Sequence, residues 1–392
     1  MSIKFRKRVR VFPGFTLNLS KTGMSATVGI KGFSLNVGNN GMYLNTGIPG
    51  TGLYDRVRLD KNSNVAPIKT ETDSGNIMPT QLNVEYEVKS YNPELLTSES
   101  LYGLKQSILD AQKIKEEMKN EYLEAESNKD MTLFFLIISH ILIFGFFLKK
   151  LKESYKQKKL FANELKEDYE NFKLSINFNF DKELLNVYIT FRKAFELLEK
   201  AEKKWDIVSF SYIDKYQQRT IADTSITRHE ISLFINTLPF INTDYSALVF
   251  QNANGGDLYL YPGFLIIKEK NNNDFAIIDY KNLKIDLSYT NFQEEEKIPT
   301  DSIQVGSTWK YTNKNGSRDK RFNNNFQIPL LRYASISFMT NDGLNEKYMF
   351  SNCETALAFY SSFDAYIKIL SNMKWNVSTE YEKLETRTSQ KE

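Results

Sequence analysis

The stretch GMSATVGIKGFSLNVGNNGMYLNTGIPG, residues 23–50, repeats its glycines with a period of nine. Between the glycines, apolar and polar residues alternate, which is typical of strands that bury one face. Glycine is favoured in the tight turns between such strands because a positive φ is cheap without a Cβ. The repeat therefore predicts an antiparallel β meander with seven glycines as structural turn residues: Gly23, Gly29, Gly32, Gly38, Gly41, Gly47 and Gly50.

A basic segment precedes the repeat. Residues 1–60 carry nine Lys and Arg against two Asp and Glu, whereas the whole chain has a net charge of +3. Five of these cations are candidate anion contacts: Lys4, Arg6, Lys7, Arg8 and Arg10. They would suit nucleic acid or anionic lipid headgroups, but charge on an exposed edge strand also prevents aggregation between sheets. We favour the protective interpretation.

The repeat lacks the residues of known ligand-binding glycine motifs. No Asp recurs from unit to unit, so the repeat does not fit a calcium-binding nonapeptide. The chain contains no Gly-Lys pair, so it lacks the lysine of a phosphate loop. We therefore expect no cofactor and no metal ion in this module.

Several short motifs accompany the glycine series: FRKRV at 5–9, PG at 13–14, LNLSK at 17–21 and IPGTGL at 48–53. Together they resemble the bacterial domain-of-unknown-function 4236 family over about residues 3–55. Asn40 departs from the pattern, because the resemblance leads us to expect a basic residue there. The resemblance implies a bacterial source and a small β module, and it brings no established activity.

Composition shifts divide the chain into five parts and predict a multi-domain α+β protein. The parts are the β module at 1–59, a polar linker at 60–91, a helical stalk at 92–205, a β domain at 206–376 and a polar tail at 377–392. Cys353 is the only cysteine, so no intramolecular disulfide can form, which suits a reducing compartment. The N-terminus has neither the apolar core nor the cleavage site of a signal peptide.

The first part of the stalk shows heptad spacing. Its apolar or small residues, interrupted by Lys115, are Leu101, Leu104, Ile108, Ala111, Met118, Tyr122 and Ala125. This spacing is typical of an amphipathic or coiled helix. It makes a homo-oligomer through the stalk one expected assembly.

An uncharged run, MTLFFLIISHILIFGFFL at residues 131–148, follows the heptads. Its 18 residues would extend about 27 Å as a helix, which is enough for a thin bilayer. A buried core helix is the competing interpretation, but such a run between charged flanks is more typical of a membrane span. The sequence therefore predicts a transmembrane helix at 131–148 and an integral membrane protein.

Lysines set the predicted orientation. Six follow the run, at positions 149, 150, 152, 156, 158 and 159, whereas Lys119 and Lys129 alone lie in the 15 residues before it. The positive-inside rule predicts a single-pass protein of the bacterial inner membrane with a cytoplasmic C-terminal domain. Because the basic N-terminal module resists translocation, a re-entrant helix with both ends in the cytoplasm is the alternative.

His140 lies within the uncharged run. An ionisable residue at mid-membrane is a candidate for a proton-transfer role. A neutral imidazole that bonds a neighbouring helix is the commoner situation. We favour this second interpretation for His140.

The C-terminal part consists of short alternating runs and predicts a mainly antiparallel β domain. Asn- and Asp-rich segments at 271–274 and 341–343 mark hairpin turns. Ser351 and Glu354 predict a capping box that opens a closing helix at 352–373. Strands followed by one helix resemble the element order of a pleckstrin-homology-like barrel.

No catalytic or metal site is predicted. His140 and His229 are the only histidines and Cys353 the only thiol, so classical zinc sites are nearly excluded. A cysteine–histidine pair would require Cys353 and His229 to meet by accident of folding. The carboxylates at 294–296 predict a solvated loop. The segment 308–325 mixes aromatic and basic residues and predicts an exposed loop that could contact a partner.

The sequence thus indicates a membrane-anchored, non-enzymatic interaction or scaffold protein with an unidentified protein partner. One alternative is a binder of anionic lipid or nucleic acid through the basic N-terminal strand, although nucleic acid is not the partner we expect. Another alternative is an enzyme with an unrecognised site in the C-terminal domain. No cofactor is predicted for any of the three.

Overall fold

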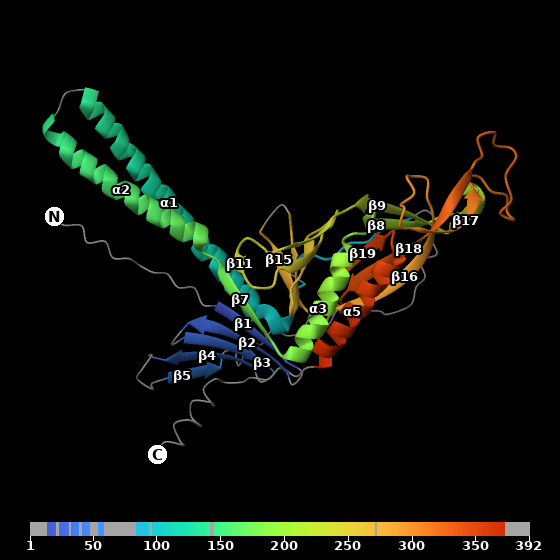
Figure 1. The fold of residues 1–392 in the computed structure, drawn as a ribbon, viewed down its shortest axis with the longest axis horizontal. Helices are drawn as coiled ribbons and strands as arrows, with labels where there is room; N and C mark the ends of the chain where they lie inside the picture. Colours follow the sequence, from blue (N-terminus) through green and yellow to red (C-terminus); the bar gives the residue numbers. More distant parts are fainter. Residues whose placement is uncertain are drawn as a thin grey trace, which may run out of the picture.

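The computed structural model describes five strands between residues 14 and 58, and then residues 84–93, 96–141, 145–270 and 273–372. This part of the chain combines helices with mainly antiparallel sheets, so the predicted α+β class is correct. Two long helices project from a body of sheets and shorter helices (Figure 1). The predicted polar tail at 377–392 and most of the predicted linker lie outside the described residues.

The glycine repeat forms a meander of five strands. They are β1 (Gly14–Ser20), β2 (Gly23–Ile30), β3 (Phe33–Gly38), β4 (Gly41–Gly47) and β5 (Tyr54–Arg58). Each strand pairs antiparallel with the next, and two residues connect each of the first three pairs. Gly23, Gly38, Gly41 and Gly47 lie at strand ends, Gly29 lies inside β2, and Gly32 and Gly50 lie outside the described residues. β2 runs through Gly29 to Ile30, so the strand continues into the predicted Gly29–Gly32 turn segment.

A strand that we did not predict continues this sheet. β7 (Leu174–Phe180) pairs in parallel with β1, and β11 (Ile241–Asn242) pairs in parallel with β7. The sequence signal was present, because Leu174, Ile176 and Phe178 alternate with polar residues and are all buried. The repeat therefore belongs to a sheet that also uses residues from the middle of the chain.

The charged helical segment folds as a hairpin. α1 (Tyr102–Ile141) runs outward and α2 (Gly145–Asn171) returns beside it (Figure 1). Lys115 Nζ donates to the Phe172 carbonyl at 3.3 Å, and Lys158 Nζ donates to Thr132 Oγ1 at 2.8 Å, so the two helices are antiparallel. The predicted heptad residues that are buried are Leu101, just before α1, and Leu104, Ile108, Ala111, Met118 and Ala125 within it.

The hairpin overturns the predicted membrane span. Within the described residues, no helix combines the length and the apolar character needed to cross a bilayer. We read the uncharged run as one continuous helix, whereas α1 ends at Ile141 and α2 begins at Gly145. The predictions of a transmembrane helix at 131–148, an integral membrane protein and a single-pass inner-membrane location with a cytoplasmic C-terminal domain are therefore wrong.

The rest of the described chain builds two further sheets. The first is an antiparallel sheet in the order β10 (Leu233–Asn236), β12 (Ala247–Phe250), β13 (Asp257–Leu260), β14 (Phe264–Lys268) and β15 (Phe275–Asp279). The second has the order β16 (Lys284–Gln293), β18 (Gln327–Met339), β19 (Asn345–Phe350), β8 (Lys204–Tyr212) and β6 (Glu85–Glu87). In addition, β17 (Ile303–Trp309) pairs with β18, and β9 (Thr224–Glu230) pairs with β8. Short helical turns, η2 (Glu99–Leu101) and α4 (Lys215–Gln218), connect these elements.

Two helices, α3 (Lys182–Leu198) and α5 (Cys353–Asn372), pack against each other through aromatic rings. The rings of Phe191 and Phe363 stack with centroids 4.5 Å apart. The predicted capping box of α5 is wrong, because the side chain of Asn352 accepts from the Thr355 amide at 3.0 Å. Ser351 Oγ instead bonds the backbone of Lys203, which ties the helix start to the strand region.

Candidate functional site

The end of the hairpin, residues 131–140, carries its large apolar side chains on the outside. Met131, Phe134, Phe135 and Ile137 are each more than half exposed. Thr132, Leu136 and Ser139, which lie between them in sequence, are buried. An exposed apolar surface therefore occupies this part of α1, which we call the hairpin end.

The buried side of the hairpin end includes two hydroxyl side chains beside Leu136. The positions Ala111, Met118, Ala125, Thr132 and Ser139 are seven residues apart and all buried, so one heptad register runs along α1. The hydroxyls of Thr132 and Ser139 each donate to a carbonyl of α1 at 2.8 Å. A helix pair in water normally buries its large apolar residues and exposes charge. The hairpin end has the reverse arrangement.

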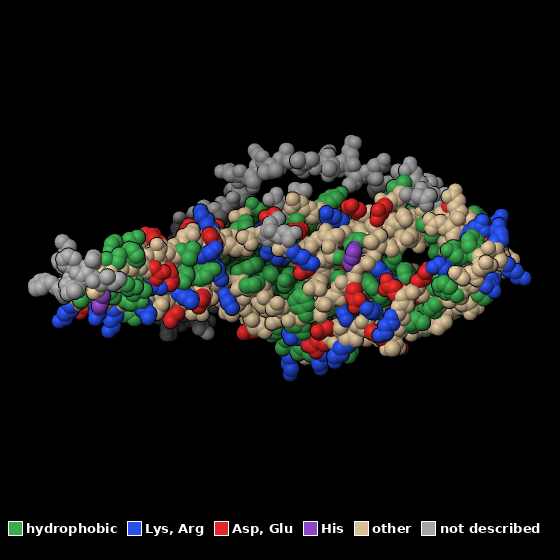
Figure 2. Space-filling model, turned by 90° about the horizontal axis from the view of Figure 1, so that it is seen from above, with side chains coloured by type: hydrophobic (Ala, Val, Ile, Leu, Met, Phe, Trp, Pro, Cys, Tyr) green, Lys and Arg blue, Asp and Glu red, His purple; other side chains and the backbone are tan. Residues whose placement is uncertain are grey.

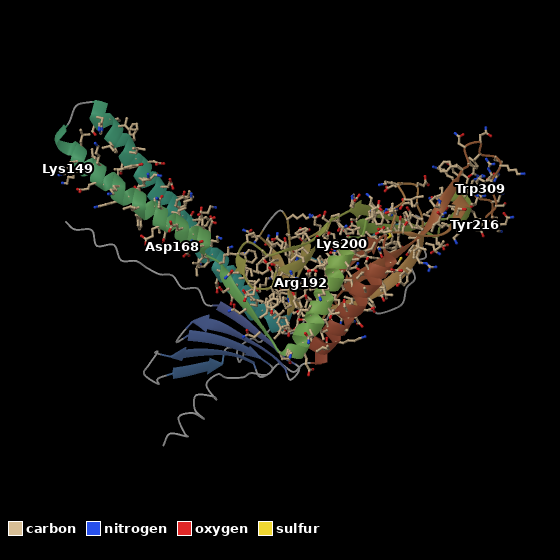
Figure 3. The ribbon with its side chains drawn as sticks, in the orientation of Figure 1. Lys149, Asp168, Arg192, Lys200, Tyr216 and Trp309 are labelled. Carbon is tan, nitrogen blue, oxygen red and sulfur yellow. The ribbon has the colours of Figure 1, made fainter. Side chains whose placement is uncertain are left out.

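Positive charge borders this apolar surface. Residues 149–159 contain six lysines and a single Glu. Lys149 lies at the far end of the hairpin (Figure 3), and there Figure 2 shows lysines beside hydrophobic side chains. Lys158 reaches back to Thr132 across the helix pair. The hairpin end thus combines apolar side chains with a basic flank.

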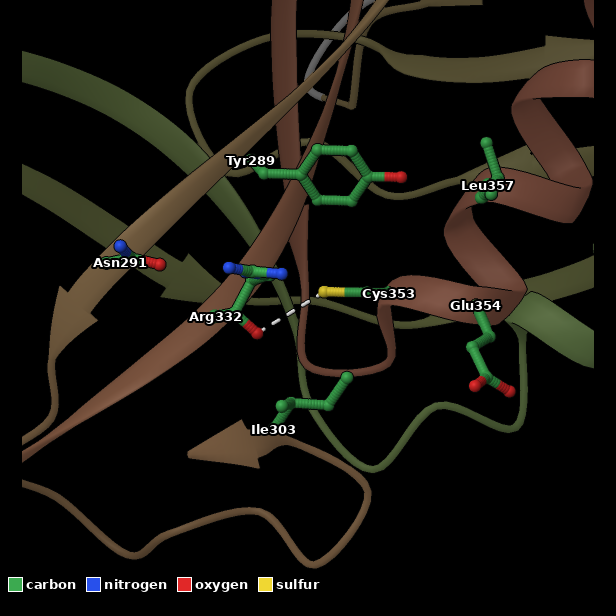
Figure 4. A pocket seen from close by; sticks show the side chains of 7 residues that line it. All are labelled: Tyr289, Asn291, Ile303, Arg332, Cys353, Glu354 and Leu357. Atoms are coloured by element: carbon green, nitrogen blue, oxygen red, sulfur yellow. Dashed lines mark hydrogen bonds between the residues drawn. The ribbon is translucent and has the colours of Figure 1, made fainter. Parts of the chain in front are cut away.

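A second candidate is a hollow of about 500 Å³ where α5 begins (Figure 4). Its lining comprises Tyr289 and Asn291 from β16, Ile303 from β17, Arg332 from β18, and Cys353, Glu354 and Leu357 from α5. Tyr289, Ile303 and Leu357 are each nearly half exposed, so the rim is apolar. The hollow could take an apolar side chain of a bound peptide.

The chemistry of this hollow favours binding over catalysis. Cys353 Sγ donates to the carbonyl of Arg332 at 3.3 Å (Figure 4). Burial raises the pKa of the Cys353 thiol, so the thiolate that nucleophilic catalysis needs is disfavoured. No histidine lines the hollow to act as a base.

A third candidate lies at the opposite end of the molecule, where Figure 3 labels Trp309 and Tyr216. The chain between β17 and β18 folds here around Asp319, which is 1% exposed. Asp319 accepts from Arg219 at 2.6 Å and from Arg321 at 2.7 Å. The bonds from Arg321, the largest cause, and from Arg219 hold the pKa of Asp319 far below its usual range. The segment that we predicted to be an exposed loop therefore has a defined structure, and the buried Asp319 carboxylate holds it together.

Among the carboxylates at 294–296, the structure corrects our prediction for one. Glu294 is 2% exposed rather than solvated. Both of its oxygens accept from Arg228 Nη2 at 2.9 Å, and it also accepts from the Tyr333 hydroxyl at 2.7 Å. The Arg228 guanidinium lies 4.1 Å from the ring centre of Trp205. A buried carboxylate needs a cationic partner. Arg228 lies far from Glu294 in the sequence, so the sequence alone does not show that the two residues meet.

A buried pair of carboxyl groups holds the segment that leads into the hairpin. Asp206 and Glu346 are 0% and 1% exposed. The Ser90 hydroxyl donates to Glu346, and Asp206 Oδ2 accepts from the Ala253 amide at 2.7 Å. Burial is the main cause that raises the pKa of Asp206 to about 6 and that of Glu346 to about 7.

The remaining predicted residues do not converge on a site. Lys4, Arg6, Lys7, Arg8 and Arg10 lie outside the described residues, so their role as anion contacts stays a prediction. His229 lies on β9, whereas Cys353 bonds a carbonyl of β18. His140 Nδ1 lies 2.8 Å from the Leu136 carbonyl of its own helix. In the part of the chain that the structure describes, no three His, Cys, Asp or Glu side chains are grouped as metal ligands.

The fold and these surfaces define an α+β protein whose helical hairpin and β body carry separate exposed surfaces. The model of the family described as "Protein of unknown function (DUF4236)" matches residues 3–56, so the predicted resemblance of the N-terminal module is confirmed. No curated protein and no solved structure matches the chain. The resemblance of the C-terminal part to a pleckstrin-homology-like barrel is therefore unsupported.

Proposed function

We propose that this chain is a non-enzymatic interaction protein whose hairpin end docks an acidic amphipathic helix of a partner protein. The observation that carries the proposal is the exposure of Met131, Phe134, Phe135 and Ile137 at one place. Gathered apolar side chains on a surface are typical of sites that another molecule covers. A partner that covers these side chains would remove their apolar surface from water, which is favourable.

The spacing of these residues supports a helix as the partner element. Met131, Phe134, Phe135 and the partly exposed Ile138 occupy positions i, i+3, i+4 and i+7 of α1. Residues at this spacing lie on one helix face, and such a stripe packs along the apolar face of another helix. The projection of the hairpin away from the body leaves room for it (Figure 1).

Charge supports an acidic partner and disfavours a second copy of the chain. Residues 149–159 carry six lysines against one Glu beside the apolar stripe. Two copies docked end to end would bring these lysines together, and like charges repel. A partner helix with carboxylates beside its apolar face would meet them favourably. Charge complementarity of this kind also speeds encounter at low salt.

A defined peptide tests the proposal. The probe is a fluorescent amphipathic helix with Leu at its heptad positions and Glu elsewhere, titrated with the full-length chain and followed by anisotropy. We expect binding that weakens at least tenfold for the Phe134→Ser/Phe135→Ser variant, because each buried Phe contributes roughly 1.5–3 kcal/mol. Leu197→Ser is the matched control, since Leu197 is 50% exposed but lies on α3. It should bind as the wild type does.

Two comparisons distinguish the alternatives. A peptide with Lys in place of every Glu should bind at least tenfold more weakly, and equal binding would remove the argument for an acidic partner. Vesicles of anionic phospholipid form the other arm. Binding to vesicles without binding to the peptide, with the same loss in Phe134→Ser/Phe135→Ser, would replace the protein partner by lipid.

A further inference from the structure

The loop between β17 and β18 gathers positive charge at the end of the molecule opposite the hairpin (Figure 2). We call residues 309–326 the basic–aromatic loop. It contains five cations, Lys310, Lys314, Arg318, Lys320 and Arg321, against one carboxylate, Asp319. Because Asp319 is buried and bound to Arg219 and Arg321, it does not present negative charge to solvent. Lys310 pairs with Glu295 at 3.0 Å, so the positive charge of the exposed surface rests mainly on Lys314, Arg318 and Lys320.

The loop has a defined shape that can present these charges. Asn325 Nδ2 donates to the carbonyls of Tyr311 at 2.6 Å and of Asp319 at 3.0 Å. The rings of Tyr311 and Phe322 stack with centroids 4.2 Å apart. Gly316 has φ of 78°, a conformation that favours glycine, and permits the tight turn at the tip. A preformed loop orders fewer groups on binding than a flexible one.

Aromatic rings alternate with the cations on this surface. Lys314 Nζ lies 5.2 Å from the ring centre of Tyr216, and Arg318 lies 4.9 Å from that of Trp309. Lys310 Nζ lies 5.2 Å from the ring centre of Phe326. Tyr216 and Phe326 are 67% and 52% exposed. Three of the five cations therefore lie beside an aromatic ring.

A hollow of about 500 Å³ lies within the loop. Its lining residues are Asn313, Ser317, Arg318, Asp319, Lys320 and Arg321. Three of these are cations, which can bond an anion. Asn313 Nδ2 donates to Ser317 Oγ and to the Arg318 carbonyl at 3.0 Å, and Ser317 Oγ donates to Asn315 Oδ1 at 2.7 Å, so these two side chains shape the hollow. The hollow suits a phosphate group.

We propose that the basic–aromatic loop binds single-stranded nucleic acid. The cations would contact successive phosphates, and Tyr216, Trp309 and Phe326 would stack on exposed bases. This combination of a positive surface and aromatic rings is how single strands are bound without sequence preference. A base-paired duplex hides the base faces that the rings would use, and an acidic peptide has no repeating planar groups. The loop is a different surface from the hairpin end, so this proposal does not depend on the proposed function.

The test uses the full-length chain and a fluorescent 20-nucleotide oligo(dT), followed by anisotropy at several salt concentrations. For Lys314→Ala/Arg318→Ala/Lys320→Ala we expect affinity to fall at least tenfold and the salt slope to decrease by about 2, since single strands give roughly 0.7 per contact. The control Lys182→Ala/Lys193→Ala/Lys200→Ala instead removes three exposed cations, two on α3 and one just after it. It should bind almost as tightly as the wild type.

The aromatic residues separate nucleic acid from other polyanions. Tyr216→Ala/Phe326→Ala should weaken oligo(dT) binding roughly tenfold while leaving the salt slope unchanged, because stacking releases no counterions. Polyglutamate of similar charge should compete poorly. Tighter binding of polyglutamate than of oligo(dT), equal losses in the loop and control variants, or no binding of oligo(dT) at low salt would each overturn the proposal.

Discussion

The base of the helical hairpin, next to the body, and its end differ in which side chains they bury and expose. One heptad register nevertheless runs through both. At the base, the position that recurs every seven residues holds buried apolar residues such as Ala111 and Met118. At the end, the same position holds Thr132 and Ser139, and large apolar residues such as Phe134 face outward. Since the backbone is helical in both regions, only the placement of side chains differs. The base is therefore arranged for folding, and the end is where we propose contact with another molecule.

The largest expected effect tests this contrast in stability. Ile108 is fully buried in the main core, so Ile108→Ala should lower the free energy of unfolding by about 4 kcal/mol through lost burial and a cavity. Phe134 is 59% exposed, so Phe134→Ala should change it by less than about 0.5 kcal/mol. Urea unfolding followed by circular dichroism measures both. Similar losses in the two variants would show that the end also supports the fold.

The sequence predicted the base of the hairpin better than the end, for a physical reason. Heptad spacing reports a buried stripe, and the structure buries Leu104, Ile108 and Met118 as expected. An uncharged run reports only that charged groups are absent, and it does not say whether the chain continues or reverses. The re-entrant alternative allowed a break at Gly145, where α2 begins, but we favoured one continuous span.

The candidate sites show the same limit. The glycine period was enough to predict a meander, because turns are local. The pairing of β7 with β1 and the burial of Glu294 against Arg228 join residues far apart in the sequence. The basic and aromatic composition of 308–325 did indicate a contact surface, but its buried anchor, Asp319, was not predicted. Long-range pairing is the information that a single sequence lacks.

A smaller effect should appear at the base as pH changes. Glu346, whose pKa is raised to about 7, bonds Ser90 in the segment that leads into α1. A carboxyl group with a raised pKa stabilises the fold at low pH, and this contribution is lost as pH rises through about 7. The free energy of unfolding should therefore fall between pH 5 and pH 8, by about 3 kcal/mol from this group. Urea unfolding at a series of pH values measures the change.

Glu346→Gln isolates that contribution. Glutamine keeps an acceptor for Ser90 but cannot ionise, so the variant should be less dependent on pH and more stable than wild type at pH 8. Glu116→Gln is the control, because Glu116 is 62% exposed on α1 and should leave the pH profile unchanged. An unaltered profile in Glu346→Gln would assign the pH dependence to other groups.

The smallest effect compares one heptad position in the two regions by reciprocal substitution. Ala125 and Thr132 are seven residues apart on α1 and are 8% and 6% exposed. Ala125→Thr adds a branched polar side chain to the buried seam nearer the base, where no space is prepared for it, and should cost about 1 kcal/mol. Thr132→Ala removes a hydroxyl that donates to the Asn128 carbonyl and accepts from Lys158. Because alanine has the higher helix propensity, the two contributions nearly offset each other, and the change should stay within about 0.5 kcal/mol. Hydrogen exchange of the α1 amides measures both locally. If both substitutions lower the stability equally, the buried contact between α1 and α2 is uniform along the hairpin. The contrast between base and end then lies only in the exposed side chains.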